Sequence, residues 1–164
     1  MNSELIDREF LQLAEEAART SNCVSRHVGC VIAQGTSVIV SGWNGVHAVS
    51  SDVSCVAAGC PHCTHAETVT GVGNDRCICV HAEQTAIAAA AKIGIAVKDA
   101  TLYSTLRPCL NCAGSTLAAG IERVVYSRDW QYAENELEKA HRELSERFIK
   151  FAFAAERPLE LASA

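Results

Sequence analysis

The chain has 164 residues and a formal net charge of −5, and this length suffices for one domain with a sizeable core. Proteins that bind nucleic acid normally present a basic surface, so the acidic balance disfavours DNA or RNA as a partner. A small anionic ligand needs only a few local cations. No apolar run approaches the roughly 18 residues needed to cross a bilayer, and the charged N-terminus does not resemble a signal sequence. We therefore expect a cytoplasmic protein that binds neither a membrane nor a nucleic acid.

The first half of the chain predicts a helix followed by a hairpin. Residues 3–20 form an amphipathic pattern with Ser3 as N-cap, and its apolar stripe comprises Leu5, Ile6, Phe10, Leu13 and Ala17. Residues 28–33 and 37–43 read as two β-strands joined by a turn at Gln34–Gly35. Residues 44–80 are rich in glycine, serine and cysteine. Such a long irregular stretch is unusual unless it is functional or held by a metal.

The second half alternates helices and strands. The alanine-rich residues 82–92 predict a helix that stops at Gly94, and the elements that follow are a strand at 100–106, a helix at 109–119, a strand at 123–127 and a helix at 130–148. The tail beyond residue 148 fits either a strand or a continued helix. This order predicts an α/β protein with three layers, α-β-α, and a mixed central sheet. No repeat or linker interrupts it, so residues 1–164 are expected to form a single domain.

One constellation carries specific chemistry. His81 and Glu83 begin the alanine-rich helix, and Pro108 precedes Cys109 and Cys112 at the start of the next helix. One imidazole and two thiolates are the ligands of a zinc ion whose fourth position is left for water, and zinc makes such a water a nucleophile near neutral pH. We expect Glu83 to move the protons without binding the metal. The pattern H-x-E…P-C-x-x-C is typical of zinc nucleobase deaminases.

A second copy of His-Ala-Glu occurs at His65–Glu67. The residues after it include β-branched side chains and two glycines, which disfavour a helix of useful length. We therefore assign the catalytic role to His81 and Glu83 and expect Glu67 to face solvent. A purely structural zinc with a nearby glutamate is the alternative.

These residues, together with SRHVGCVIA, SGWNG, HAEQTAI and GIERVVY, resemble the deoxycytidylate (dCMP) deaminase family over residues 10–132. The resemblance implies a cytidine-deaminase-like fold, a catalytic zinc, hydrolysis of dCMP to dUMP, and assembly into a homo-oligomer, in similar enzymes a hexamer. It also implies that Asn44 binds the sugar and that Ser25 and Arg26 meet the phosphate or sugar; the alternatives are a turn residue and an exposed arginine. Trp130 replaces a common tyrosine and lines either the pocket or the core.

The cysteines predict a second metal site. There are nine, an odd number, and paired cysteines at short spacing around a loop are more consistent with a structural zinc than with disulfides. The favoured ligands are Cys60, Cys63 and Cys77, with Cys23 or Cys79 as the fourth; His65 is a weaker candidate, and free buried cysteines are the alternative. Cys30 reads as a buried strand residue.

Other functions remain open at this point. A deaminase of another base or nucleotide, such as dCTP, cytidine or guanine, is one alternative, although cytidine deaminases of the nucleoside type usually carry cysteine where His81 stands. A zinc module without catalytic activity is a further possibility. A nucleic-acid deaminase is disfavoured by the acidic charge and by the lack of a basic groove with aromatic residues.

Overall fold

The computed structural model describes residues 3–47, 53–64 and 77–154. Within these residues a five-stranded sheet has the order β2-β1-β3-β4-β5. Strand β1 runs antiparallel to β2 and β3, whereas β3, β4 and β5 are parallel. The prediction of an α/β fold with a mixed sheet is therefore confirmed. The bounds are α1 Ser3–Ala18, β1 Gly29–Gln34, β2 Ser37–Trp43, α2 Ala82–Lys92, β3 Thr101–Ser104, α3 Leu110–Ala118, β4 Arg123–Tyr126, α4 Asn135–Ser145 and β5 Lys150–Phe153.

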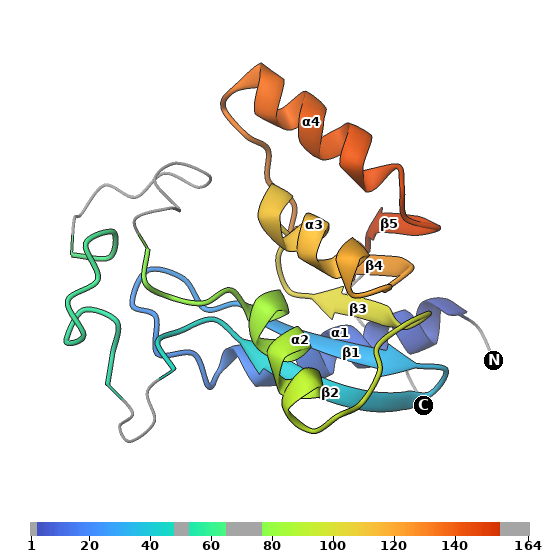
Figure 1. Ribbon diagram of the computed structural model, residues 1–164, viewed down its shortest axis with the longest axis horizontal. Coiled ribbons are helices and arrows are strands. Elements are labelled where there is room, and N and C mark those ends of the chain that lie inside the picture. Colours follow the sequence, from blue (N-terminus) through green and yellow to red (C-terminus); the bar gives the residue numbers. More distant parts are fainter. Residues whose placement is uncertain (1–2, 48–52, 65–76, 155–164) are drawn as a thin grey trace, which may run out of the picture.

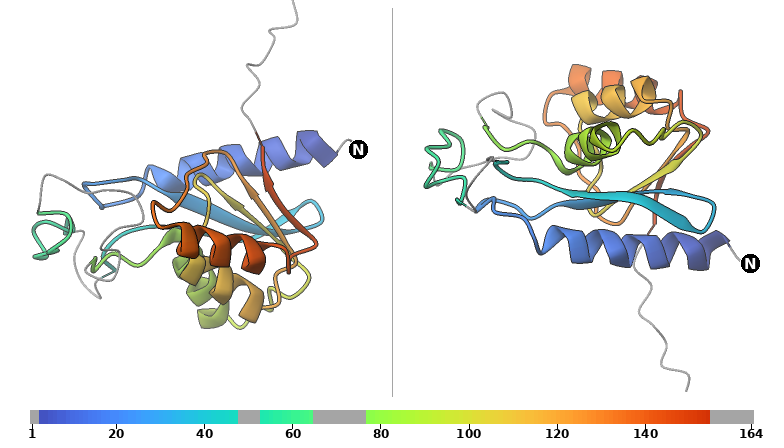
Figure 2. Two further views of the ribbon diagram at one scale, coloured as in Figure 1. Left: turned by 90° about the horizontal axis from the view of Figure 1, so that it is seen from above. Right: turned by 60° about the horizontal axis from the view of Figure 1, so that its bottom comes forward.

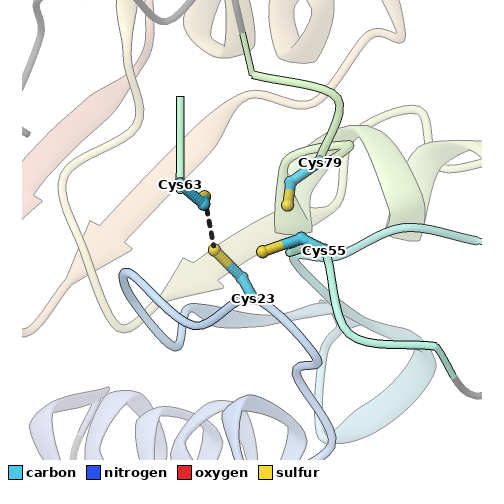
Figure 3. Close-up of side chains that lie close together, drawn as sticks. All are labelled: Cys23, Cys55, Cys63 and Cys79. Carbon is cyan, nitrogen blue, oxygen red and sulfur yellow. Dashed lines mark hydrogen bonds between the residues drawn. The ribbon is translucent and has the colours of Figure 1, made fainter. Parts of the chain in front are cut away.

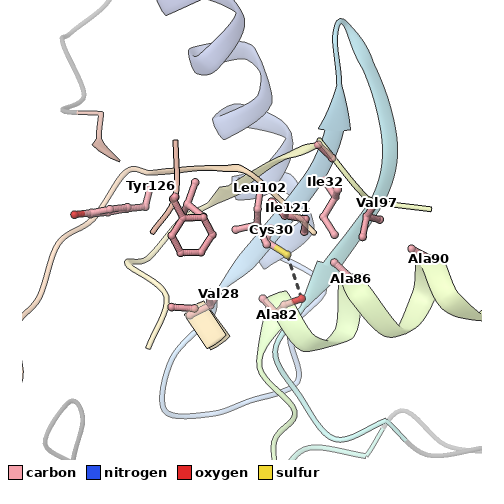
Figure 4. Packing of buried hydrophobic residues seen from close by; sticks show 14 residues of the cluster. Val28, Cys30, Ile32, Ala82, Ala86, Ala90, Val97, Leu102, Ile121 and Tyr126 are labelled. Atoms are coloured by element: carbon pink, nitrogen blue, oxygen red, sulfur yellow. Dashed lines mark hydrogen bonds between the residues drawn. The ribbon is translucent and has the colours of Figure 1, made fainter. Parts of the chain in front are cut away.

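Helices cover both faces of the sheet, as the views in Figures 1 and 2 show: α1 lies on one face, and α2, α3 and α4 lie on the other. The side chains of β1 alternate between the two resulting cores. Cys30 and Ile32 point to the α2 side (Figure 4), whereas Val31 and Ala33 pack with α1. Residues 29–33 of β1 are buried, and they form a continuous apolar run that ends at the exposed Gln34.

Helix α1 buries a different face from the predicted one. Its buried residues are Asp7, Phe10, Leu11, Ala14 and Ala18, whereas the predicted Leu5 and Leu13 are 54% and 38% exposed. The difference arises because Asp7 accepts hydrogen bonds from Tyr103 and Lys150, and a paired carboxylate can occupy a buried position. Ser3 itself is helical, so it does not occupy the N-cap position.

Several predicted boundaries also shift. The hairpin turn falls at residues 35–36, because Gln34 still pairs with Ser37. Helix α4 begins only at Asn135, so Trp130 lies in the loop before it rather than in a helix. Residues 150–153 of the ambiguous tail form edge strand β5. In the described part of the chain, none of the helices has the length and apolar character that crossing a membrane requires.

Helix α2 packs unusually close to the sheet, and this closeness positions the site. The inward face of α2 consists of alanines, and Ala82, Ala86 and Ala90 are at most 1% exposed. Opposite them, β2 contributes Gly42, where a Cβ would lie 2.4 Å from the Ala82 carbonyl oxygen. The small residues on both sides therefore set the distance between α2 and the sheet.

Candidate active site

Two helix N-termini bring the three predicted zinc ligands together. His81 is the N-cap of α2 and Cys109 is the N-cap of α3, while Cys112 lies in the first turn of α3. The His81 Nδ1 atom lies 3.5 Å from Cys109 Sγ and 3.3 Å from Cys112 Sγ. All three ligand atoms lie within 4.8 Å of one another. Pro108 precedes the N-cap, so it stands just outside the helix rather than in its first turn.

The chemistry of this donor set fits zinc. The pKa of the Cys109 thiol is lowered to about 4, first by a hydrogen bond from Cys112 and then by the hydrogen bond with His81. The same contact with Cys109, together with burial, raises the pKa of Cys112. Two sulfurs and an imidazole that already share protons at this distance can bind a dication once the protons leave. An N/S/S set of this kind is found in zinc enzymes that keep one position for solvent.

Glu83 lies beside the donor set without belonging to it. Its side chain is 3% exposed, and Ser104 donates a hydrogen bond of 3.4 Å to Oε1. Burial raises the pKa of this carboxyl above its usual range, which suits a group that must both accept and return a proton. On the inner side, Cys30 donates to the Ala82 carbonyl oxygen at 3.1 Å, so Cys30 is a buried core residue, as the sequence indicates.

The loop that carries Cys109 is held by residues to which the sequence assigned no role. Arg107 is 8% exposed, and its guanidinium forms a bidentate ion pair with Glu138 of α4. The same guanidinium lies 2.8 Å from His141 Nδ1. Since arginine can only donate, Nδ1 accepts, and His141 Nε2–H donates to the Pro108 carbonyl oxygen at 2.7 Å.

Two aromatic residues complete this support. Tyr132 accepts a hydrogen bond of 2.8 Å from the backbone N–H of Leu110, the first residue of α3. Trp130 donates from Nε1 to the Arg107 carbonyl oxygen at 2.7 Å. The loop between β4 and α4 therefore fixes the start of α3. A sequence search could detect only the arginine before Pro-Cys, because the partners lie more than twenty residues away.

A pocket opens in front of these groups. Its lining includes His81, Glu83 and Cys109 together with the four residues proposed for substrate binding, Ser25, Arg26, Asn44 and Trp130. The structure thus brings every predicted substrate contact to the same pocket. Ser25 is exposed and Arg26 is half-buried, as expected for side chains at the entrance.

Asn44 also organises the pocket wall. Its Oδ1 accepts hydrogen bonds of 2.8 Å from Ser21 Oγ and from the Val28 backbone N–H, and its Nδ2 donates to the Arg26 carbonyl oxygen at 2.7 Å. The contacts of Oδ1 engage the carbonyl end of the amide, and the contact of Nδ2 uses one of its two N–H donors. One N–H is therefore the group that Asn44 can offer to a ligand.

Six cysteines converge next to this pocket. Two groups have their sulfurs within 4.8 Å of one another: Cys60, Cys63, Cys77 and Cys79 form one group, and Cys23, Cys55, Cys63 and Cys79 form the other. Figure 3 shows the second group, whose side chains point toward a common centre. Of the two predicted fourth ligands, Cys79 therefore joins Cys60, Cys63 and Cys77, whereas Cys23 belongs with Cys55. Spacing along the chain did not indicate Cys55 as a ligand, because it belongs to neither of the closely spaced cysteine pairs.

None of the nine cysteines forms a disulfide. Within the cysteine cluster, burial favours the neutral thiol of Cys60, but several hydrogen bonds, led by those of the Cys63 and Ile78 backbone, together lower its pKa to about 7. Residues His65 and Glu67, the second His-Ala-Glu copy, lie outside the described residues, so the hypotheses about them stay predictions.

An N/S/S donor set beside a buried carboxylate, on a sheet covered by helices on both faces, defines a class of proteins, the zinc-binding deaminases. Residues 5–128 match the family described as the zinc-binding region of cytidine and deoxycytidylate deaminases, and the chain belongs to this family.

Individual relatives and a solved structure support this family assignment. The chain is 38% identical over 120 residues to the deoxycytidylate deaminase of Schizosaccharomyces pombe, covering 73% of this chain and 36% of that protein. It is 37% identical to the deoxycytidylate deaminase of Mycobacterium phage D29, covering 75% of this chain and 94% of the phage protein. The dCMP deaminase of cyanophage S-TIM5, solved in complex with dCMP and dUMP, superposes with a TM-score of 0.67 at 23% identity, over 95% of this chain and 99% of that one. This structural likeness supports the cytidine-deaminase-like fold.

The alignments also differ in extent. The chain spans 36% and 39% of the length of the two yeast relatives, although it spans nearly the whole phage protein.

Proposed function

We propose that this protein hydrolyses dCMP to dUMP and ammonia. The observation that carries the proposal is the convergence of His81, Cys109 and Cys112 within 4.8 Å, next to a buried glutamate that does not belong to the donor set. The deoxycytidylate deaminases among the relatives support the choice of substrate.

His81, Cys109 and Cys112 would hold the catalytic zinc. When bound, the metal supplies a Lewis acid that makes water a nucleophile near neutral pH. Glu83 would act as the general base and general acid. Its carboxylate would remove a proton from the attacking water and deliver it to the ring nitrogen of cytosine, and it would then transfer the second proton of that water to the amino group, which leaves as ammonia. The Ser104 hydroxyl holds Oε1 and so orients the carboxylate for these transfers.

The nucleotide would lie in the pocket between the zinc ligands and the α1–β1 loop. The Asn44 amide would donate to the sugar, and Arg26 would meet the phosphate, since a guanidinium matches phosphate geometry. Trp130 would form the wall on the side of the Cys109 loop. These assignments are compatible with a small anionic substrate despite the acidic net charge.

The test is ammonia release from dCMP by purified protein and by Glu83→Gln. The amide keeps the size of the side chain but cannot cycle a proton, so we expect turnover to fall by roughly 10²–10⁴-fold while the zinc content stays unchanged. Glu146→Gln, at an exposed position, is the matched control and should retain full activity. Undiminished turnover in Glu83→Gln would refute the assigned role.

A substrate panel identifies the base and the phosphate requirement. We expect dCMP to exceed cytidine, dCTP and guanine in kcat/KM. Equal turnover of cytidine and dCMP would remove the argument for a phosphate contact, and no turnover of any base would favour a zinc module without catalytic activity.

We further propose that residues 1–164 act as one deaminase-type domain, that the cysteine cluster holds structural zinc, and that the protein works as a cytoplasmic homo-oligomer. None of the nine cysteines forms a disulfide, which suits a reducing compartment. Ile149 and Phe153, at the β5 edge of the sheet, are 73% and 50% exposed, and apolar side chains at a sheet edge favour self-association. Light scattering on the purified protein measures the assembly, including the hexamer that similar enzymes form.

A further inference from the structure

We propose that the cysteine cluster is a binuclear zinc site, in which six thiolates bind two zinc ions and Cys63 and Cys79 bridge them. The proposal deepens the structural zinc proposed above, and it does not depend on which base the enzyme deaminates. The two groups of four cysteines have two members in common, and these are Cys63 and Cys79. Two tetrathiolate sites that share two sulfurs require six cysteines, which is the number present.

The spacing of the sulfurs matches zinc coordination. Zinc binds thiolate at about 2.3 Å, so two sulfurs of one tetrahedral site stand about 3.8 Å apart. Cys60 Sγ and Cys77 Sγ, both in the first group, lie 3.8 Å apart. Cys23 Sγ and Cys63 Sγ, both in the second group, also lie 3.8 Å apart. Each group therefore contains an edge of the expected length, and both edges are far longer than a disulfide bond.

The cysteines that belong only to the second group are also buried and supported by the backbone. Cys23 is 4% exposed and Cys55 is fully buried, and the backbone N–H of Val24 donates to Cys55 Sγ at 3.3 Å. Backbone donors to sulfur are the contacts that hold and tune metal-binding thiolates. A single zinc in the first group would leave both of these cysteines as buried thiols beside it.

Charge balance also favours two ions. One zinc with four thiolates carries a net charge of −2, and the other two cysteines stay protonated. When a second zinc binds, it displaces those two protons, and two dications with six thiolates again carry −2. The second ion thus adds ligand bonds without adding charge to a buried site, where uncompensated charge is costly.

The backbone around the cluster supports such a site because it joins three separate segments. Asn22, next to Cys23, donates to the carbonyl oxygens of Val46 and Val53, and Cys55 N–H donates to the Asn22 carbonyl oxygen at 3.1 Å. Gly45 and Val80 form a β-bridge that holds the segment of Cys77 and Cys79. Metal binding would connect these three segments at their centre. The free energy of binding would offset the conformational entropy that the segments lose when they are held together.

The position of the cluster gives it a consequence for the active site. Cys23, Cys63, Cys77 and Cys79 line the same pocket as His81 and Glu83. The occupied cluster therefore forms a wall of the substrate pocket and holds the α1–β1 loop that contains Ser25 and Arg26.

Metal analysis of the purified holoprotein tests the proposal. We expect three zinc ions per chain, one at the catalytic site and two in the cluster. Two per chain, or iron in place of zinc, would overturn the binuclear site. The same measurement on Cys112→Ala, which lacks a catalytic ligand, should give two zinc ions and no turnover of dCMP. The cluster count is thus read separately from the proposed deaminase activity.

Bridging is tested on the unmodified chain loaded with ¹¹³Cd²⁺. Two cadmium resonances that are coupled to each other through shared sulfur are expected, and uncoupled resonances would overturn the bridge. Among variants, Cys63→Ser should lose both cluster ions, Cys60→Ser should lose no more than one, and the core control Cys30→Ser should keep all three zinc ions. Equal losses in Cys63→Ser and Cys60→Ser would also overturn the bridge.

Discussion

Trp130 and Arg107 hold each other by reciprocal hydrogen bonds: Trp130 Nε1 donates to the Arg107 carbonyl oxygen at 2.7 Å, and Arg107 Nη1 donates to the Trp130 carbonyl oxygen. Both residues line the pocket. This pair fastens the loop after β4 to the loop that precedes Cys109. The aromatic side chain is therefore part of the pocket wall and also part of the support of the predicted zinc ligand Cys109.

Trp130→Phe should uncouple these two roles, because phenylalanine keeps an aromatic ring but has no donor. We expect the free energy of unfolding to fall by about 1 kcal/mol, and kcat/KM for dCMP to fall by roughly tenfold or more as the Cys109 loop shifts. Denaturant unfolding and ammonia release measure the two effects. Tyr103→Phe removes a comparable hydrogen bond on the α1 face, so it should lower stability without changing kcat/KM. Equal effects of both variants on activity would contradict the positioning role.

Gly42→Ala should displace α2. The added Cβ would lie 2.4 Å from the Ala82 carbonyl oxygen and 2.6 Å from the Ala86 backbone nitrogen, and neither backbone group can move alone. Overpacking of this kind costs about 1–3 kcal/mol. Because α2 carries His81 and Glu83, we also expect lower turnover.

Gly114→Ala is the matched control for that substitution. It lies within α3 and has nothing within 4 Å of its added Cβ, so the change should stabilise the protein by about 0.5–1 kcal/mol. Thermal unfolding of both variants gives the comparison. A stable, active Gly42→Ala protein would show that the distance between α2 and β2 does not determine the site.

His141 should make stability depend on pH. Burial lowers its pKa in the folded protein below the ordinary value of 6.5, and Arg107, facing Nδ1, opposes protonation. Below about pH 6.5 the unfolded chain therefore binds a proton at His141 that the folded chain does not bind. The stability that neutral His141 contributes is fully present above pH 6.5 and is lost as the pH falls toward the folded pKa. Glu138, the other charged group at this site, has a lowered pKa and contributes its own loss only below pH 4.5.

We expect the difference in unfolding free energy between the native protein and His141→Gln to shrink as pH falls from about 7.5 to 5.5. Glutamine can still accept from Arg107 and donate to the Pro108 carbonyl oxygen, but it does not titrate. Zinc release at low pH affects both proteins and cancels in the difference. A difference that stays constant over this range would show that His141 protonates freely in the folded state.

Arg26→Gln tests the phosphate contact. A lost charge-assisted hydrogen bond costs about 1.5–3 kcal/mol, so we expect kcat/KM for dCMP to fall by roughly 10–100-fold, while turnover of deoxycytidine changes little. Arg19→Gln, at an exposed position after α1, is the control for the change in net charge. Equal losses with dCMP and deoxycytidine would place Arg26 in a structural role through its loop.

Much of the fold followed from local patterns. The limits of α2 and β2 agree with the prediction, because an alanine run that ends at Gly94 and a β-branched run that ends at Trp43 carry strong local signals. The prediction of the buried face of α1 was wrong, because burial of Asp7 depends on Tyr103 and Lys150, which lie far away in the chain. The predicted start of α4 was also wrong, because Trp130 and Tyr132 make hydrogen bonds to the loop and first residue around Cys109 instead of continuing the helix toward the N-terminus.

The sequence by itself determined the donor atoms and the carboxylate of the proposed catalytic site, because ligand type and short spacing are local properties of His81–Glu83 and Cys109–Cys112. Only the tertiary structure decided which cysteines meet in the second cluster and which residues support the Cys109 loop. Cys23, Cys55 and Cys79 become neighbours through the packing of three segments, and His141 reaches Pro108 across the α3–α4 contact. Distances between separate segments are set by packing and by long-range hydrogen bonds, which no spacing along the chain encodes.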